Sequence, residues 1–264
     1  MTEPKLDITR PAELPGVLRL TFNHPESLNS LTTDIFREIV RTLRDARTDE
    51  SVKIVLFTGE GDRAFSSGLS IDKLLLMETD DDRAAFYNLG LEVRAAIYAL
   101  DKPVIAAVRG NCVGGGFEIA LCCDLIYAAE GSVFMLPESN IALTPGIGGA
   151  INLAAKIPYN RAVEMIWFAE KVAAEEMQKW GIVNAIFPTD TFDAEIEKRI
   201  LKLLRKPQFA VRGLKQVLSH TAVFGDQSES LKYERILAVD EMKTADFDEG
   251  LRAFKEKRRA EFGK

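Results

Sequence analysis

The run VKIVLFTG at residues 52–59 is the feature of the sequence that most constrains the fold. A half-buried strand alternates apolar and polar residues, but this run is apolar at most positions and ends at Gly59. It therefore predicts a strand that is buried on both faces. The segment DKPVIAAVRG at residues 101–110 contains a second short strand of this kind.

Amphipathic segments separate the strands along the first part of the chain. The segment VLRLTFN at residues 17–23 alternates as a strand does, and TTDIFREIVRTLRDARTD follows it with the period of a helix. Thr33 or Asp34 has the side-chain oxygen needed to start that helix. Ser70 is expected to have the same role for a helix after FSSGLS.

The pattern changes near residue 190. Helices are expected around residues 83–100 and along residues 149–169, whereas residues 191–264 are almost wholly helical in pattern and more charged. Alternating strands and helices predict an α/β layer architecture. We therefore expect an α/β core that carries the functional site at residues 1–190, and a separate helical region at residues 191–264.

Composition excludes several classes of protein. The chain is 47% hydrophobic and 28% charged, as globular proteins are, and its net charge of −6 argues against binding to nucleic acids or anionic membranes. Three cysteines without a CxxC pair predict buried thiols rather than a disulfide frame or a metal site. The N-terminus lacks the apolar core of a signal peptide, and no run approaches a membrane span. We expect a cytoplasmic protein.

Few motifs for cofactor or nucleophile chemistry occur in the sequence. The Walker pattern is absent, and the glycines near residue 114 do not have the GxGxxG spacing. The two histidines, His24 and His220, lie in no recognisable nucleophile or metal context. Chemistry is therefore expected from carboxylates, backbone groups or a bound cofactor.

Two glycine turns offer backbone donors. In FSSGLS, Leu69 follows a glycine at a helix start, and in RGNCVGGGFEIALCCDL three glycines precede an apolar helix. Without side chains, another group is able to approach the backbone there closely. Two amides that converge on one carbonyl oxygen form an oxyanion hole. The alternative is that both turns are ordinary helix starts.

Glu118 and Glu138 are the candidate acid–base pair. Glu118 lies in the first turn of the apolar helix after the glycines, and Glu138 follows a proline after the apolar stretch VFML. The alternative for Glu118 is a glutamate that favours the helix dipole, and for Glu138 a solvated turn residue.

Several ordered stretches carry a resemblance to a known family. They are FNHPESLNSL, AFSSGLSIDKL, KPVIAAVRGNCVGGGFEIALCCDLIYAAE, FMLPESNIALTPGIGG, AEEMQKWGIVNAIFP and AFKEKRRAEF. Nearly from end to end, the chain resembles members of the crotonase (enoyl-CoA hydratase/isomerase) superfamily. The resemblance implies a crotonase-like spiral of repeated ββα units with a C-terminal helical trimerisation region, in a homotrimer or a dimer of trimers.

The resemblance also implies a mechanism. It makes the amides of Leu69 and Gly115 the donors to a thioester oxygen, makes Glu118 and Glu138 the carboxylate pair, and puts Gly146 beside the reacting water. Relatives that keep both glutamates commonly hydrate 2-enoyl-CoA thioesters. By this likeness, Glu138 delivers the α-proton and Glu118 binds and helps to activate the water.

The implied ligand is an acyl-CoA thioester, with coenzyme A as the substrate's carrier and with no separate cofactor or metal. Its binding residues by resemblance are Leu28, Ser67, Phe254 and Lys257. The sequence departs from the family pattern at Ser70, where aspartate is usual, and at His24, where arginine is common. These departures leave the acyl group open.

Other functions remain possible at this point. The same fold supports acyl-CoA isomerases, hydrolases and carbon–carbon lyases, which only the acyl pocket separates. A non-catalytic CoA-binding or RNA-binding relative is a further alternative, and the acidic net charge and the two glutamates count against it.

Overall fold

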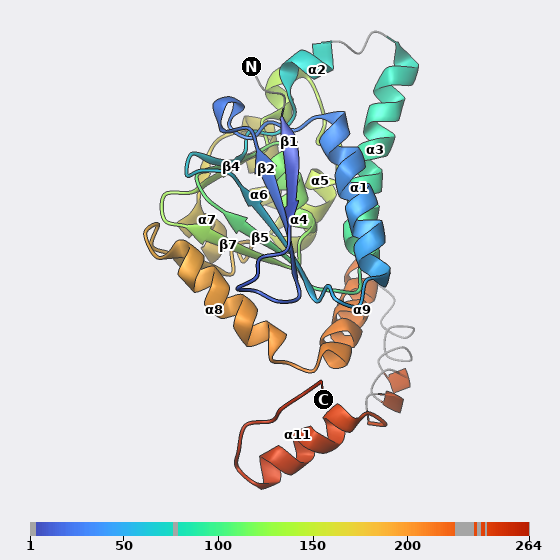
Figure 1. Cartoon of the computed structure of the whole chain (residues 1–264). Coiled ribbons are helices and arrows are strands. Elements are labelled where there is room, and N and C mark those ends of the chain that lie inside the picture. The colour runs from blue at the N-terminus through green and yellow to red at the C-terminus, as the bar shows by residue number, and fades with distance from the viewer. Residues whose placement is uncertain (1–3, 76–78, 225–234, 237–238, 241, 264) are drawn as a thin grey trace.

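Two sheets form the body of the protein in the computed structural model, which describes residues 4–75, 79–224, 235–236, 239–240 and 242–263. The larger sheet has the order β1-β2-β3-β5-β7-β10, and the smaller one has the order β4-β6-β8-β9 (Figure 1). Strands β2, β3, β5, β7 and β10 pair in parallel, whereas β1 is antiparallel to β2. The strands of the larger sheet are β1 (Lys5–Thr9), β2 (Val17–Asn23), β3 (Ile54–Gly59), β5 (Val104–Val108), β7 (Leu125–Ala129) and β10 (Ala185–Phe187).

The chain repeats one unit, in which a strand of each sheet is followed by a helical segment. The strands of the smaller sheet are β4 (Ala64–Ser66), β6 (Asn111–Val113), β8 (Val133–Met135) and β9 (Val172–Ala173). The pairs β3–β4, β5–β6 and β7–β8 lead to α2 (Ile71–Leu75) with α3 (Asp80–Ala99), to α4 (Gly115–Cys122), and to η2 (Glu138–Ile141) with α5 (Gly149–Lys156). The predicted ββα repeat is therefore present.

Strand β3 is buried on both faces, as predicted. Val55 and Phe57 belong to the main core, together with residues of α1 (Thr33–Thr48), α3 and α4. Ile54 and Leu56 belong to a second core, which α8 (Phe192–Leu204) completes on the opposite face. Alternate residues of one strand thus contribute to two apolar layers.

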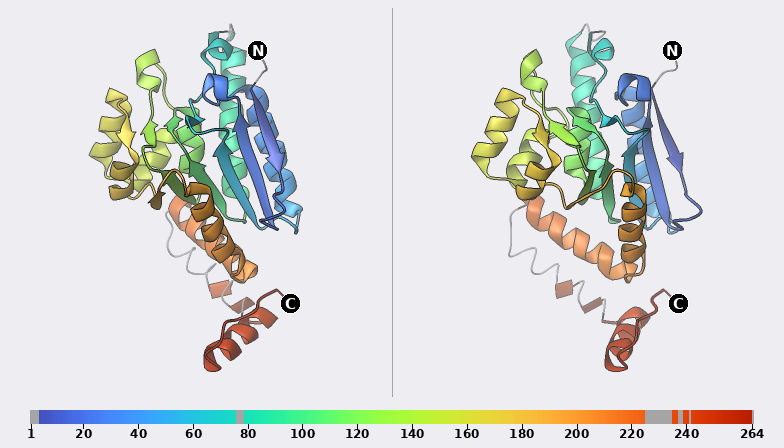
Figure 2. Two further views of the ribbon diagram at one scale, coloured as in Figure 1. Left: turned by 60° about the vertical axis from the view of Figure 1, so that its left-hand side comes forward. Right: turned by 90° about the vertical axis from the view of Figure 1, so that its left-hand side faces the viewer.

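The remaining elements are mostly helical. They are η1 (Pro25–Ser27), α6 (Tyr159–Phe168), α7 (Ala174–Lys179), α9 (Gln208–Phe224) and α11 (Ala245–Lys255). Figures 1 and 2 show α11 beyond α8 and α9, away from both sheets. The helical character expected after residue 191 is confirmed for the described residues, whereas the division into two regions stays a prediction.

Helix boundaries differ from the expected ones where a cap is involved. Thr32, rather than Thr33 or Asp34, caps α1, because its side chain accepts the amide of Ile35 at 3.3 Å. Helix α3 starts before residue 83, since Thr79 forms a capping box with its first turn. Ser70 immediately precedes α2, and its carbonyl accepts the amide of Leu74 at 3.2 Å, whereas its role as a side-chain cap stays a prediction.

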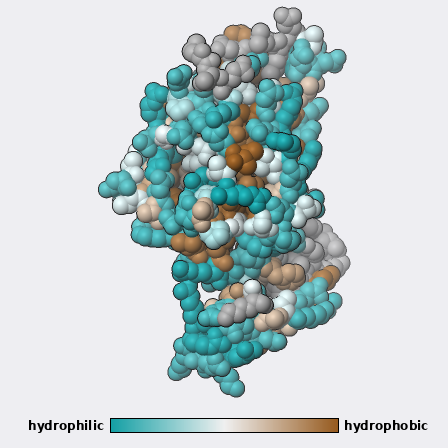
Figure 3. Space-filling model, viewed as in Figure 1, coloured by the Kyte–Doolittle hydropathy of each residue, from teal (hydrophilic) through white to brown (hydrophobic). Residues whose placement is uncertain are grey.

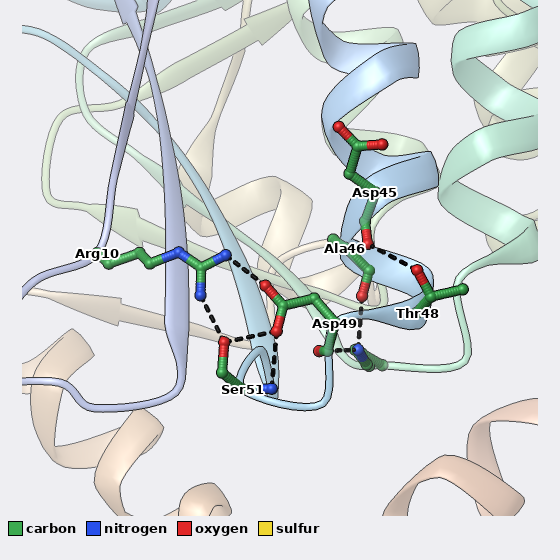
Figure 4. A network of polar contacts seen from close by, with 7 residues as sticks. Arg10, Asp45, Ala46, Thr48, Asp49 and Ser51 are labelled. Atoms are coloured by element: carbon green, nitrogen blue, oxygen red, sulfur yellow. Dashed lines mark hydrogen bonds and ion pairs between the residues drawn. The ribbon is translucent and has the colours of Figure 1, made fainter.

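Lys102, which lies just before β5, is buried and forms hydrogen bonds to the C-terminal end of α1. The Nζ atom of Lys102 donates to the carbonyl oxygens of Ala46 at 2.5 Å and Asp49 at 2.7 Å, and the side chain is fully buried. The carboxylate of Asp49 is held in turn by Arg10 and Ser51 (Figure 4). The cation thus satisfies carbonyls that a helix leaves unpaired at its C-terminal end.

Mostly hydrophilic residues cover the face shown in Figure 3, with smaller apolar areas between them. Within the residues that the structure describes, no helix is both long enough and apolar enough to span a membrane.

Candidate active site

The three glycines at 114–116 allow two other segments to approach the start of α4. Gly114 has φ of 51°, and a Cβ atom there would lie 3.1 Å from Oε1 of Glu138. A Cβ atom on Gly116 would lie 2.5 Å from the Cβ of Ser66, which is closer than real Cβ contacts. The glycines therefore bring β4 and the carboxyl group of Glu138 against the N-terminus of this helix.

The amides of Leu69 and Gly115 are available for a ligand. Leu31 pairs with the residues on either side of Leu69, accepting from Ser70 at 2.9 Å and donating to Gly68 at 2.8 Å, so the amide of Leu69 faces away from this pairing. Gly115 is the first residue of α4, whose first amides have no acceptor within the helix. Neither amide donates to an acceptor in the described part of the chain.

Leu69, Gly115 and Glu138 share one cavity of about 370 Å³. Its lining is Ser27, Ser30, Ser67, Gly68, Leu69, Ser70, Ile71, Leu74, Gly114, Gly115, Pro137, Glu138, Ile141 and Leu143. A larger cavity, of about 900 Å³, lies between α5 and α9 and contains none of the predicted site residues. The predicted site residues therefore line the smaller of these two cavities.

Glu118 is almost completely buried, and backbone amides hold its carboxylate. Oε1 accepts the amide of Ile147 at 2.7 Å and that of Gly149 at 2.9 Å, and the amide of Gly146 also bonds to the carboxylate. Burial raises the pKa of Glu118 above its usual range, while these three amides act in the opposite direction. The three amides thus limit the rise that burial causes, because they bind the ionised form.

Glu138 has a different environment. It is the first residue of η2, its side chain is 8% exposed, and its Oε2 atom has no hydrogen-bond partner in the described residues. Burial, followed by the charge of Glu118, raises the pKa of Glu138 to about 7. This carboxyl group is therefore able both to hold and to release a proton near neutral pH.

The loop at residues 144–149 carries Gly146 next to Glu118, to which its amide donates, whereas the place of Gly146 beside a reacting water stays a prediction. On its other side the ring of Tyr87, from α3, lies against Gly146, with Cε1 2.8 Å from the position of a Cβ atom. Sequence reasoning missed the roles of Tyr87, Ile147 and Gly149. The three glycines in PGIGG were the available signal, since a glycine often marks a close approach of another group.

The residues expected to bind coenzyme A are only partly brought together. Ser67 lines the cavity, and its amide donates to the carbonyl of Leu28 at 2.8 Å. Lys257 is exposed and follows α11, which lies away from the cavity in this chain (Figures 1 and 2). Phe254 belongs to α11, and its side chain lies outside the described part of the structure.

Other predictions about chemistry can also be compared with the structure. The three cysteines, Cys112, Cys122 and Cys123, are free and buried, as expected. Among the described residues, no group of three or more His, Cys, Asp and Glu side chains could hold a metal ion. His24 makes a short contact of 2.5 Å with the hydroxyl of Ser27, at the edge of the cavity.

Chemically, the site combines two functions. Two amides without an acceptor among the described residues line one cavity with the carboxyl group of Glu138, and the buried carboxylate of Glu118 affects the pKa of Glu138. Amides of this kind are able to stabilise negative charge on an oxygen atom, and carboxyl groups of different environment are able to move protons. This combination suits the addition or removal of a proton next to a carbonyl group.

Comparisons with known proteins agree with this geometry. The family model for enoyl-CoA hydratase/isomerase matches residues 13–264. The crotonyl-CoA hydratase of Syntrophomonas wolfei is 33% identical over 92% of this chain and 93% of that protein, and the 2,3-dehydroadipyl-CoA hydratase of Escherichia coli is 32% identical over 93% and 94%. The crystal structure of an enoyl-CoA hydratase from Mycobacterium smegmatis superimposes with a TM-score of 0.91 at 27% identity, covering 98% of this chain and 99% of that one.

The matches extend over nearly the whole length of the chain and of its relatives, and they agree with the repeated ββα units. The α/β spiral implied by the sequence is thereby confirmed. This chain belongs to the enoyl-CoA hydratase/isomerase family of the crotonase superfamily.

Proposed function

We propose that this protein adds water across the 2,3 double bond of 2-enoyl-CoA thioesters. The observation that carries the proposal is the pair of free amides, at Leu69 and Gly115, in one cavity with the unpartnered carboxyl group of Glu138. The naming of relatives as enoyl-CoA hydratases supports the same activity.

In this proposal, the thioester oxygen of the substrate accepts hydrogen bonds from Leu69 and Gly115. Addition to the β-carbon moves negative charge onto that oxygen, so both hydrogen bonds strengthen as the enolate develops. One such donor is worth about 2.7–4 kcal/mol in comparable sites. The two amides would therefore supply a large share of the barrier reduction.

The two glutamates divide the proton transfers between them. Water joins the β-carbon through its oxygen and gives one proton to Glu118, while Glu138 gives a proton to the α-carbon. The total number of protons on the pair is unchanged, because Glu118 gains the one that Glu138 loses. The hydrogen bonds to Glu118 favour its ionised form, and the pKa of about 7 keeps a proton on Glu138 for much of the time.

Coenzyme A would be the carrier of the acyl group, and no cofactor is needed for these steps. Leu28 and Ser67 would contact it at the cavity, and Phe254 of α11 and Lys257, which follows that helix, would bind it as well. The two relatives named above are hydratases of different acyl-CoA thioesters, crotonyl-CoA and 2,3-dehydroadipyl-CoA. The proposal therefore specifies the hydration of an enoyl-CoA and no particular acyl group.

A homotrimer, alone or paired into a hexamer, would bring α11 against a neighbouring subunit. Two features support this assembly: α11 lies away from the sheets of its own chain, and the cavity between α5 and α9 has exposed apolar side chains at its rim. Ile151, Leu214 and Leu218 are 60–69% exposed there. Sedimentation equilibrium would give the assembly state. A cytoplasmic location stays a prediction.

The test of the function is the loss of the ultraviolet absorbance of the conjugated enoyl thioester, measured with short, long and cyclic enoyl-CoAs. Glu118→Gln and Glu138→Gln keep the side-chain shape and remove the acid, so each is expected to lower kcat about a hundredfold or more. Full activity in both variants would contradict the site. A 3-enoyl-CoA that gains this absorbance, with no hydration of any 2-enoyl-CoA, would show an isomerase instead.

A further inference from the structure

We propose that Tyr87 is a positioning residue for this reaction, which holds the 144–149 loop so that its amides keep the Glu118 carboxylate in place. The inference rests on the proposed function, because Glu118 has its role only if water is added or removed at this site. Tyr87 belongs to α3 and does not line the cavity.

Tyr87 contacts the loop in two ways. Its hydroxyl donates to the carbonyl of Thr144 at 3.1 Å. Its ring covers Gly146, with Cε1 at 2.8 Å and Cδ1 at 3.1 Å from the position that a Cβ atom would take. The ring therefore occupies the space beside Gly146, and a side chain at this position would require the ring to move.

Gly90 and Arg94, one and two turns after Tyr87 on α3, also contact the 144–149 loop. A Cβ atom on Gly90 would lie 3.3 Å from Cγ1 of Ile147, and Cδ of Arg94 lies 2.8 Å from the Cβ position of Gly148. Positions 87, 90 and 94 lie on one face of a helix. This face of α3 thus supports the loop along most of its length.

The loop in turn is what holds Glu118. The hydrogen-bond donors to this carboxylate in the described residues are the amides of Gly146, Ile147 and Gly149. No side chain has that role there, so the direction of the carboxylate depends on the shape of the loop. A substitution of Tyr87 would therefore affect the reaction indirectly, by shifting the amides of Gly146 and Ile147 that bind the Glu118 carboxylate.

Among the described residues, three titratable groups are close enough to Glu118 for its charge to raise their pKa. They are Glu138 of η2, Tyr87 of α3 and Cys122 of α4. Of these, Tyr87 is the one that also contacts the loop.

The experiment compares Tyr87→Phe with Tyr98→Phe. Both residues lie on α3 and both lose a hydroxyl that bonds at 3.1 Å, but Tyr98 bonds to Asn152 of α5 instead of the 144–149 loop. For Tyr87→Phe we expect kcat to fall about three- to tenfold, with KM for the CoA ester unchanged. Because the amides then bind Glu118 less firmly, the acidic limb of the kcat profile should move upward by about half to one pH unit.

A second readout does not need activity. The infrared carboxyl band of Glu118, identified by subtraction of the Glu118→Gln spectrum, is titrated in the same variants without substrate. In Tyr87→Phe its midpoint should rise, and in Tyr98→Phe it should stay at the wild-type pH. Equal behaviour of the two variants, or an unchanged midpoint in Tyr87→Phe, would overturn the inference. If the wild type hydrates no enoyl-CoA but the midpoint is still higher in Tyr87→Phe than in the wild type, the proposed function is refuted and the support that Tyr87 gives to Glu118 stands.

Discussion

The Cγ atom of Glu118 lies 2.7 Å from the position that a Cβ atom would take on Gly149. The two residues are in contact although they are far apart along the chain, because the first turn of α4 packs against the first turn of α5. Gly149 both donates its amide to Oε1 of Glu118 and leaves room for that side chain. The position of the carboxylate thus depends on the absence of one methyl group.

Gly149→Ala is therefore expected to displace the Glu118 carboxylate and lower kcat about tenfold or more, because both the contact and the hydrogen bond are lost. Steady-state kinetics with an enoyl-CoA substrate would measure this. Gly250→Ala is the control, since a Cβ atom there has its nearest neighbour at 3.6 Å, an ordinary contact. Equal loss in both variants would mean that the effect does not come from Glu118.

Activity should depend on pH with a basic limb near pH 7. Glu138 must carry a proton to deliver it, and its pKa of about 7 means that the protonated fraction falls about tenfold for each pH unit above that value. The profile of kcat/KM against pH measures this limb. Its persistence in Glu138→Gln would assign the limb to another group.

The ionisation of Glu138 should also affect folding stability. Glu138→Gln, which is expected to lower activity, should raise stability at high pH. The pKa of Glu138 is raised in the folded protein, so the native state binds more protons than the unfolded state between about pH 4.5 and 7, and stability falls as the pH rises through this window. Glu138→Gln removes the ionisation and should be more stable than wild type at pH 8 by up to about 3.4 kcal/mol, the equivalent of the whole rise in pKa. Urea unfolding at pH 4 and pH 8 measures the difference, which should be small at pH 4. A constant difference at both values would refute the linkage.

Lys102→Met should destabilise the fold without changing the chemistry. Its ammonium group satisfies the carbonyls of Ala46 and Asp49, and a buried carbonyl that loses its partner costs about 1–3 kcal/mol. Denaturant unfolding measures the loss, with Lys198→Met as a control, because Lys198 is exposed and pairs with Glu195 on its own helix. A change of less than about 0.5 kcal/mol in Lys102→Met would contradict this role.

Sequence patterns were informative where a local signal existed. The apolar run at residues 52–59 predicted a strand with two buried faces, and the three glycines before α4 predicted a close approach of another group. The strands β1, β4, β6 and β9 are among those that were not predicted. The last three are two or three residues long, which is too short for a period of two to be recognised. Capping residues were displaced by one position at α1, because adjacent threonines offer the same oxygen.

By itself the sequence determined the alternation of strands and helices, the buried thiols, the family, and the candidates Glu118, Glu138, Leu69 and Gly115. The tertiary structure decided what surrounds each candidate. The contrast between a carboxylate held by three amides and one left without a partner at Oε2 depends on loops that are distant in sequence. The contact of Tyr87 with Gly146 likewise exists only after α3 packs on the 144–149 loop, because no local pattern records which side chain will meet a bare backbone.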